Sequence, residues 1–155
     1  MRKKELALIV LIVFIDLITK ALINQRFLLG ESMELIRGFF YLTYIHNTGA
    51  AWGIFPNLTW FFNIVSFLGS IFCIIWLFKI PREKILYRYS ITLMLAGTIG
   101  NLYDRFFLKY VRDFLDFKIF GYDFPVFNIA DSALTIGVIC LFLLAWLKPE
   151  ELSDE

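Results

Sequence analysis

The chain has 155 residues, of which 59% are hydrophobic and 19% are aromatic, and its mean hydropathy is +0.71. A soluble domain of this composition would expose a large apolar surface, so the composition indicates a membrane protein. The net charge of +1 gives no basic excess for a nucleic-acid partner, and the two cysteines, Cys73 and Cys140, form no CxxC pattern. We therefore expect no nucleic acid, no redox motif and no zinc site.

Four apolar stretches are each long enough to cross a bilayer as a helix of roughly 18–23 residues. They comprise residues 6–23, 58–78, 85–103 and 126–147. The first contains Asp16 and Lys20 and has no A-x-A cleavage pattern, so we interpret it as a retained helix rather than a signal peptide. The predicted fold is a mainly α-helical membrane protein with four transmembrane helices, in a single domain over residues 1–155.

The charges beside these stretches predict an orientation. Basic residues flank the first stretch and fill the short loop between the second and the third, at Arg2, Lys3, Lys4, Lys79, Arg82 and Lys84. The positive-inside rule makes this side cytoplasmic, which places both termini in the cytoplasm and the loops 24–57 and 104–125 outside. Alternating topology alone brings one set of polar residues to a common side, namely Asp16, Lys20, Asn101, Asp104, Arg105, Asn128 and Asp131.

The first outer loop contains a sequence that favours β-structure. Residues 39–45, FFYLTYI, are aromatic and β-branched, which is typical of a strand. Residues 27–38 are expected to pair with this strand. Irregular or β backbone cannot face lipid, so this part of the chain is predicted to lie at the membrane surface.

Asp131 lies within the last apolar stretch, where an ionised carboxylate costs on the order of a few kcal/mol. The preceding loop holds two candidate partners, Asp113 and Asp116. Two carboxylates in a low-dielectric site do not readily both ionise, so one keeps a proton and acts as acid while the other acts as base on a water. This pattern predicts amide hydrolysis of the aspartic-protease type, which needs no metal and no cofactor.

Other roles for these residues remain open. Asp16 and Lys20 lie one helical turn apart, and we favour a structural ion pair for them, while Asp131 is also placed to cap a helix. A Ser–Lys peptidase would use Ser132 with Lys20. The single histidine, His46, and the absence of G-x-S-x-G and HExxH motifs make Ser-His-Asp and zinc peptidases poorer interpretations.

Two further alternatives are not peptidases. The chain could be a small proton-coupled transporter with Asp16, Lys20 and Asp131 as a relay, but a relay predicts polar groups through the full depth of the membrane. A non-catalytic lipid-binding or assembly subunit is the other alternative. It predicts that function survives replacement of an aspartate by asparagine.

Four motifs, taken in order along the chain, resemble one known family. They are NTGAA at residues 47–51, GTIGNLYDR at 97–105, VRDF at 111–114 and FNIAD at 127–131. Together with Asp16 and Lys20 in the first helix, they resemble lipoprotein signal peptidase, also called signal peptidase II. The resemblance covers nearly the whole chain, and the combination of motifs is highly specific.

The resemblance implies a membrane aspartyl endopeptidase of the bacterial cytoplasmic membrane. It would remove signal peptides from prolipoproteins by cleaving before a cysteine that carries diacylglycerol, with no cofactor and with its active site near the outer face. The implied fold adds a small extracytoplasmic β-cradle, including residues 39–45, and a short amphipathic surface helix around residues 55–62. The expected partners are the lipidated prolipoprotein and membrane lipid, and we expect a monomer.

The same resemblance implies roles for single residues. Asp113 and Asp131 match the catalytic dyad, and Asp104 is expected to orient a loop. The residues expected to bind substrate or to support the site are Asn47, Gly49, Asn101, Arg105, Asn128, Asp16, Lys20 and Asp104. Four positions depart from the commonest family pattern without removing a catalytic group, namely Leu17, Trp52, Ala96 and Arg112.

Overall fold

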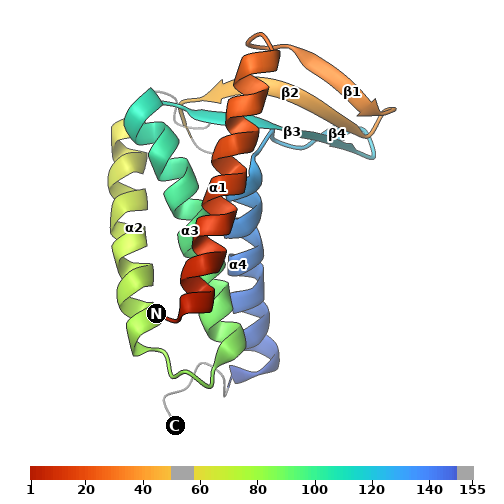
Figure 1. Ribbon diagram of the computed structural model, residues 1–155. Helices are drawn as coiled ribbons and strands as arrows, with labels where there is room; N and C mark the ends of the chain where they lie inside the picture. Colours follow the sequence, from red (N-terminus) through yellow and green to blue (C-terminus); the bar gives the residue numbers. More distant parts are fainter. Residues whose placement is uncertain (50–57, 150–155) are drawn as a thin grey trace.

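The computed structural model describes residues 1–49 and 58–149, which form a bundle of four helices with an antiparallel sheet at one end (Figure 1). The sheet projects sideways from the end of the bundle at which α1 finishes and α4 begins. In chain order the elements are α1 (Lys3–Arg26), β1 (Ser32–Ile36), β2 (Phe40–Asn47), α2 (Thr59–Lys79), α3 (Ile85–Leu108), β3 (Val111–Ile119), β4 (Tyr122–Asp123) and α4 (Ile129–Leu147).

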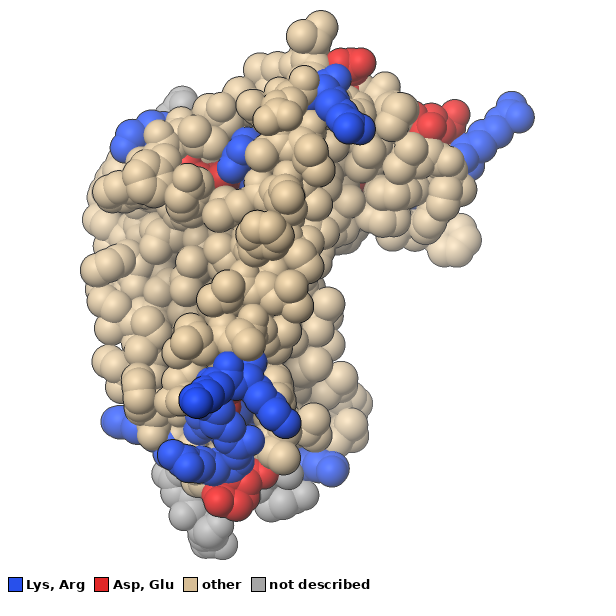
Figure 2. All heavy atoms as spheres, in the orientation of Figure 1, with Lys and Arg blue, Asp and Glu red and all other residues tan. Residues whose placement is uncertain are grey.

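Three helices of the described part, α1, α2 and α4, are long and apolar enough to cross a membrane. They leave large apolar side chains exposed on the outside of the bundle, among them Phe14, Trp60, Phe72 and Phe142. Uncharged side chains cover the middle of the molecule in Figure 2, whereas Lys and Arg gather at the end where the chain begins. These features confirm the predicted class, a mainly α-helical membrane protein with a small antiparallel sheet.

Helix α3 packs against each of the other three helices and buries more polar side chains than any of them. Near its start, Arg88 is buried and its Nε donates to Oε1 of Glu5 in α1 at 2.6 Å. Its middle contributes Leu95 and Ala96 to an apolar cluster that also contains Cys73. The polar residues of α3 therefore face partners inside the bundle, which explains how the helix tolerates them.

Helices α3 and α4 approach each other closely because α3 carries glycine at the contact. A Cβ atom on Gly97 would lie 2.2 Å from the carbonyl oxygen of Ala130, and a Cβ on Gly100 would lie 2.9 Å from the Cβ of Ala130. Both distances are shorter than a side chain can accept. The small residues therefore let the backbones of α3 and α4 meet directly beneath the start of α4.

We expect Gly97→Ala to lower the free energy of unfolding by about 1–3 kcal/mol, the usual cost of overpacking, because the clashing atom belongs to the backbone of α4. Thermal unfolding in detergent would measure the loss. Gly69→Ala is the matched control, since nothing lies within 4 Å of a Cβ on that helical glycine. Equal unfolding midpoints for the two variants would contradict the close packing of α3 against α4.

The sheet confirms one prediction and adds a strand that was not predicted. The strand predicted at residues 39–45 corresponds to β2, and β1 pairs with it in antiparallel fashion. Within the predicted outer loop 104–125, α3 continues to Leu108 and β3 then pairs with β2. Charged residues interrupt the apolar alternation of β3, and neighbouring elements hold the strand by hydrogen bonds that sequence patterns do not reveal.

Part of the predicted outer surface lies outside the described residues. This applies to Trp52 and to the first part of the amphipathic helix predicted around residues 55–62. The described remainder of that segment, from Thr59, is the first turn of α2.

Strand β3 is tied to the segment that enters α4. The amides of Phe114 and Leu115 donate to the carbonyl oxygen of Phe127 at 3.0 and 2.8 Å, and the amide of Phe127 donates back to Leu115 at 3.0 Å. These bonds bring the middle of β3 beside the first turn of α4, although the two elements are separate in the sequence.

Candidate active site

The first turn of α4 forms a reciprocal cap around Asp131. The Asn128 side chain is the N-cap and accepts a hydrogen bond from the Asp131 amide at 2.9 Å. Oδ2 of Asp131 accepts in turn from the Asn128 amide at 3.2 Å. The spacing N-x-x-D therefore produces a capping box, which fixes the orientation of both side chains at the helix terminus.

Asp113 lies on β3, and only 1% of it is exposed. Its Oδ1 accepts from Nδ2 of Asn128 at 2.6 Å, and its Oδ2 accepts from Nδ2 of Asn47 at 3.0 Å. Asn47 is itself held because its side-chain oxygen accepts from the Gly49 amide at 2.9 Å. Asn128 thus contacts both aspartates, Asp113 through its NH2 group and Asp131 through the cap.

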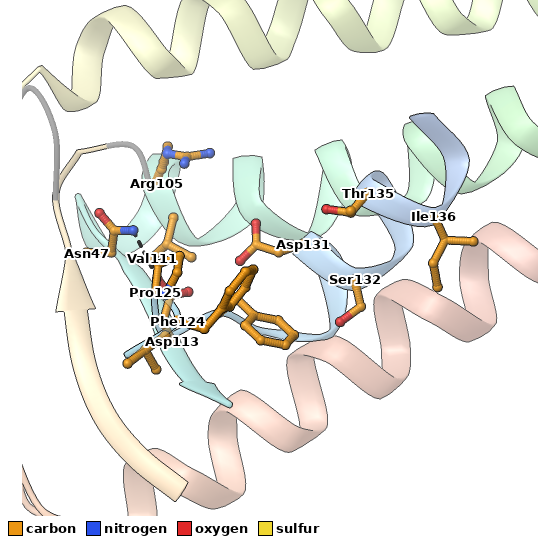
Figure 3. A pocket seen from close by; sticks show the side chains of 12 residues that line it. Asn47, Arg105, Val111, Asp113, Phe124, Pro125, Asp131, Ser132, Thr135 and Ile136 are labelled. Carbon is orange, nitrogen blue, oxygen red and sulfur yellow. Dashed lines mark hydrogen bonds between the residues drawn. The ribbon is translucent and has the colours of Figure 1, made fainter. Parts of the chain in front are cut away.

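Both carboxylates face one cavity of 480 Å³ (Figure 3). Its wall is apolar on one side, and its polar groups gather around the aspartates. The lining residues are Asn47, Arg105, Val111, Asp113, Phe124, Pro125, Val126, Phe127, Asp131, Ser132, Thr135 and Ile136. A cavity of this kind can hold a peptide with apolar side chains while exposing its backbone to two carboxyl groups.

The surroundings of Asp113 favour its protonated form. Burial raises its pKa from the ordinary 3.8 to about 7, and the negative charge of Asp131 acts in the same direction. Hydrogen bonds from Asn47 and Asn128, together with the charge of Lys20, oppose these effects. A carboxyl group with a pKa near neutrality can serve as an acid in the physiological range.

A buried network of charged residues that do not line the cavity supports the two aspartates. Nζ of Lys20 lies 2.7 Å from Oδ2 of Asp16 and 3.6 Å from Oδ2 of Asp104. Asp104 also accepts from Nη2 of Arg112 at 2.6 Å and from the Arg112 amide at 3.0 Å, so it anchors the start of β3. Oδ1 of Asp16 accepts from the Ala130 amide at 2.9 Å. The network thus joins α1, α3, β3 and the first turn of α4.

Asn101 and Arg105 project from α3 toward the aspartates. Asn101 donates to Oδ1 of Asp131 at 2.6 Å and accepts from Lys20 at 3.0 Å. Arg105 lines the cavity, and its guanidinium carbon lies 5.6 Å from the centre of the Phe62 ring. Arg105 therefore places a positive charge within the cavity, whereas Asn101 lies between the cavity and the buried network.

The other candidate groups are engaged elsewhere. Asp116 accepts a hydrogen bond from Thr43 and is not among the residues that line the cavity. Ser132 donates to the Asn128 carbonyl at 3.0 Å, while Lys20 contacts Asp16, so the two do not form the pair that a Ser–Lys peptidase requires.

The residues of the apolar wall of the cavity were not among the predicted site residues. Phe124, Pro125 and Phe127 directly precede the helix that carries Asp131, and Thr135 follows Asp131 by one helical turn. Proximity in sequence to the FNIAD motif was the available signal for these residues.

Known proteins match the chain over most of its length. A sequence model of the family described as signal peptidase (SPase) II matches residues 8–147. The lipoprotein signal peptidase of Desulfitobacterium hafniense is 44% identical over 134 residues, covering 86% of this chain and 87% of the relative. That of Staphylococcus aureus is 42% identical over 139 residues, covering 90% and 85%.

Solved structures agree with these relatives. One bacterial membrane enzyme superimposes with a TM-score of 0.88 at 39% identity, covering 98% of this chain and 92% of the other. A second gives a TM-score of 0.84 at 41% identity, covering 94% and 93%. The chain therefore belongs to the signal peptidase II family, the aspartic-type lipoprotein signal peptidases that remove signal peptides from prolipoproteins.

Proposed function

We propose that Asp113 and Asp131 are the catalytic dyad of this peptidase. The observation that carries the proposal is that both carboxylates line the same cavity and accept hydrogen bonds from one residue, Asn128, whose side chain donates to Asp113 and whose backbone amide donates to Asp131. Each carboxylate also accepts from the side-chain amide of a further asparagine, which is Asn47 for Asp113 and Asn101 for Asp131. Two carboxyl groups held in this way can share one proton, as aspartic proteolysis requires.

The reaction follows from that shared proton. The ionised carboxylate takes a proton from a water molecule, and the water oxygen bonds to the carbonyl carbon of the scissile peptide. The protonated carboxyl gives its proton to the leaving nitrogen, and the C–N bond breaks. Transfer of a proton from the first carboxyl to the second restores the starting state.

The neighbouring polar residues position these groups. Asn47 and Asn128 orient Asp113, Gly49 holds the Asn47 amide, and Asn101 orients Asp131. Arg105 is placed to bind a substrate carbonyl in the cavity.

Residues behind the cavity support it without lining it. Asp104 orients the start of β3 through Arg112. The pair of Asp16 and Lys20 joins α1 to the first turn of α4.

The substrate class follows from the membrane setting. We infer that the cleaved bond precedes a cysteine modified with diacylglycerol, because the cavity joins an apolar wall to polar groups at one end of the bundle. Membrane lipid surrounds the helices, and a monomer contains every residue of the proposed dyad. The relatives give no support to a transporter or to a non-catalytic subunit.

The proposed topology treats the chain as one domain over residues 1–155. In this topology α3 crosses the membrane together with α1, α2 and α4. It has 24 residues, as many as α1, and it runs within the bundle. The basic end lies in the cytoplasm with both termini. The dyad and the sheet then lie near the outer face of the bacterial cytoplasmic membrane, where the sheet forms a cradle for the substrate.

The pH dependence of kcat/KM follows from the pKa of Asp113, about 7. Since the dyad needs one proton, we expect kcat/KM to fall about tenfold per pH unit once Asp113 loses its proton above that value. The same raised pKa means that the folded state loses stability as the pH rises from 3.8 to about 7. A rate that instead climbs between pH ~7 and ~9 would indicate a lysine base and contradict the dyad.

The direct test is cleavage of a diacylglyceryl-modified prolipoprotein by the purified protein in detergent or lipid. Turnover and substrate binding are measured separately for the wild type, Asp113→Asn and Asp131→Asn. Loss of turnover with binding retained in both variants supports the dyad, whereas full activity in either variant overturns it.

A further inference from the structure

The two amides beside the dyad are each oriented by a group that can only donate hydrogen bonds. Nζ of Lys20 donates to Oδ1 of Asn101 at 3.0 Å, and the Asp131 amide donates to Oδ1 of Asn128 at 2.9 Å. An asparagine whose oxygen receives such a donor must direct its NH2 group elsewhere. Those NH2 groups donate to Asp131 and to Asp113, each at 2.6 Å.

Asn101 differs from Asn128 because one of the two donors to its oxygen is a full charge on another helix, Lys20, while the other is Nδ2 of Asn128 at 3.1 Å. Lys20 of α1 is completely buried, forms ion pairs with Asp16 and Asp104, and donates a hydrogen bond to Asn101. A line of hydrogen bonds from an ammonium through an amide to a carboxylate is strongest when the carboxylate is ionised. The contact of Lys20 with Asn101 therefore favours the charged form of Asp131.

Other charged groups lie in the same cavity as Asp131 or in the network around Lys20. Arg105 of α3 and Asp113 of β3 line the cavity. Asp16 of α1, Asp104 of α3 and Arg112 of β3 belong to the network. Arg112 pairs with Asp104 at 2.6 Å, and Arg105 lies against the Phe62 ring. Lys20 is the cation that reaches Asp131 through a continuous line of hydrogen bonds in the described part of the chain.

We propose that Lys20 is a positioning residue that acts through Asn101, holding Asp131 as the ionised, water-activating member of the dyad and leaving Asp113 as the acid. This inference rests on the dyad proposed above. Lys20 does not line the cavity, so it would set the order of proton transfer without touching the substrate.

The test uses a charge-balanced double variant, Lys20→Met with Asp16→Asn, so that neither partner is left as an unpaired buried charge. We expect kcat to fall roughly tenfold or more while KM changes little, since the base is misplaced rather than removed. We also expect the acid limb of the kcat–pH profile to move up by about one pH unit, because the charge that favours ionised Asp131 is gone.

The matched control is Glu5→Gln with Arg88→Met. It removes a buried ion pair of 2.6 Å at the opposite end of the bundle. The control reports the cost of losing such a pair, and its pH profile should match the wild type. A Lys20/Asp16 variant with a wild-type profile, or with the same behaviour as the control, would overturn the inference.

The Asn101→Asp variant provides a second test of the inference if the Lys20/Asp16 double variant folds poorly. It keeps an acceptor for Lys20 and replaces the NH2 group that donates to Asp131 by an oxygen, so the acid limb should again move to higher pH. An unchanged profile overturns the inference. If the Asp131→Asn protein still cleaves the substrate, the dyad itself is refuted. If the Asp131→Asn protein is inactive but the Lys20/Asp16 double variant behaves like the wild type, only the role of Lys20 is refuted.

Discussion

Asp113→Asn and Asp131→Asn are each expected to reduce kcat by at least about 10²–10⁴-fold, the range that general acid–base groups contribute. Asparagine keeps the shape of the side chain but can neither take a proton from water nor give one to the leaving nitrogen. Substrate binding should persist, because the apolar wall of the cavity is unchanged. The measurement is single-turnover cleavage of the lipidated prolipoprotein, with binding followed separately.

Two control variants separate the dyad from its alternatives. Asp116→Asn changes the same residue type on the same strand, but its carboxylate bonds to Thr43 outside the cavity, so turnover should stay close to the wild type. Ser132→Ala removes the hydroxyl that a Ser–Lys peptidase would use and should remain active. If the Ser132→Ala protein were inactive and the Asp113→Asn protein active, the result would support a Ser–Lys peptidase instead of the dyad.

Asp104→Asn is expected to lower the free energy of unfolding by about 3–5 kcal/mol, the cost of leaving a buried charge without its partner. Asp104 is fully buried and accepts from the side chain and the backbone amide of Arg112. It also lies 3.6 Å from Nζ of Lys20. An asparagine would turn an NH2 group toward one of these donors and would remove the charge that both cations require.

The matched control is Asp123→Asn. Asp123 pairs with Lys118 at 3.5 Å, but its side chain is 77% exposed, so solvent screens the interaction. Thermal and denaturant unfolding in the same detergent should show a large loss for Asp104→Asn and little change for Asp123→Asn. If the two variants were equally stable, Asp104 could not be the anchor of β3.

Membrane helices follow from local composition, which is why the sequence predicted them well. The stretches at residues 6–23, 58–78 and 126–147 correspond to α1, α2 and α4, all apolar enough to cross a membrane. The last helix begins at Ile129 rather than at residue 126, because Asn128 caps it. Strand β3 was missed since its charged residues find partners in α3 and in the segment before α4.

The sequence by itself determined the features that depend on short spacing. The N-x-x-D pattern produces the cap that holds Asp131, and the separation of Asp16 and Lys20 by one helical turn produces their ion pair. Membership of the signal peptidase II family was likewise visible in the motifs, and the relatives confirm it.

Only the tertiary structure shows that Asp113, and not Asp116, lines the same cavity as Asp131. Asp113 and Asp116 lie on one strand, where successive side chains alternate between faces, so residues three apart point to opposite sides. The face that meets the cavity depends on how β3 pairs with β2, including an irregularity between Leu42 and Ile45. The pairing register depends on contacts between segments far apart in the sequence, and so do the hydrogen bonds from Lys20 through Asn101 to Asp131. Spacing along a single segment does not specify such contacts.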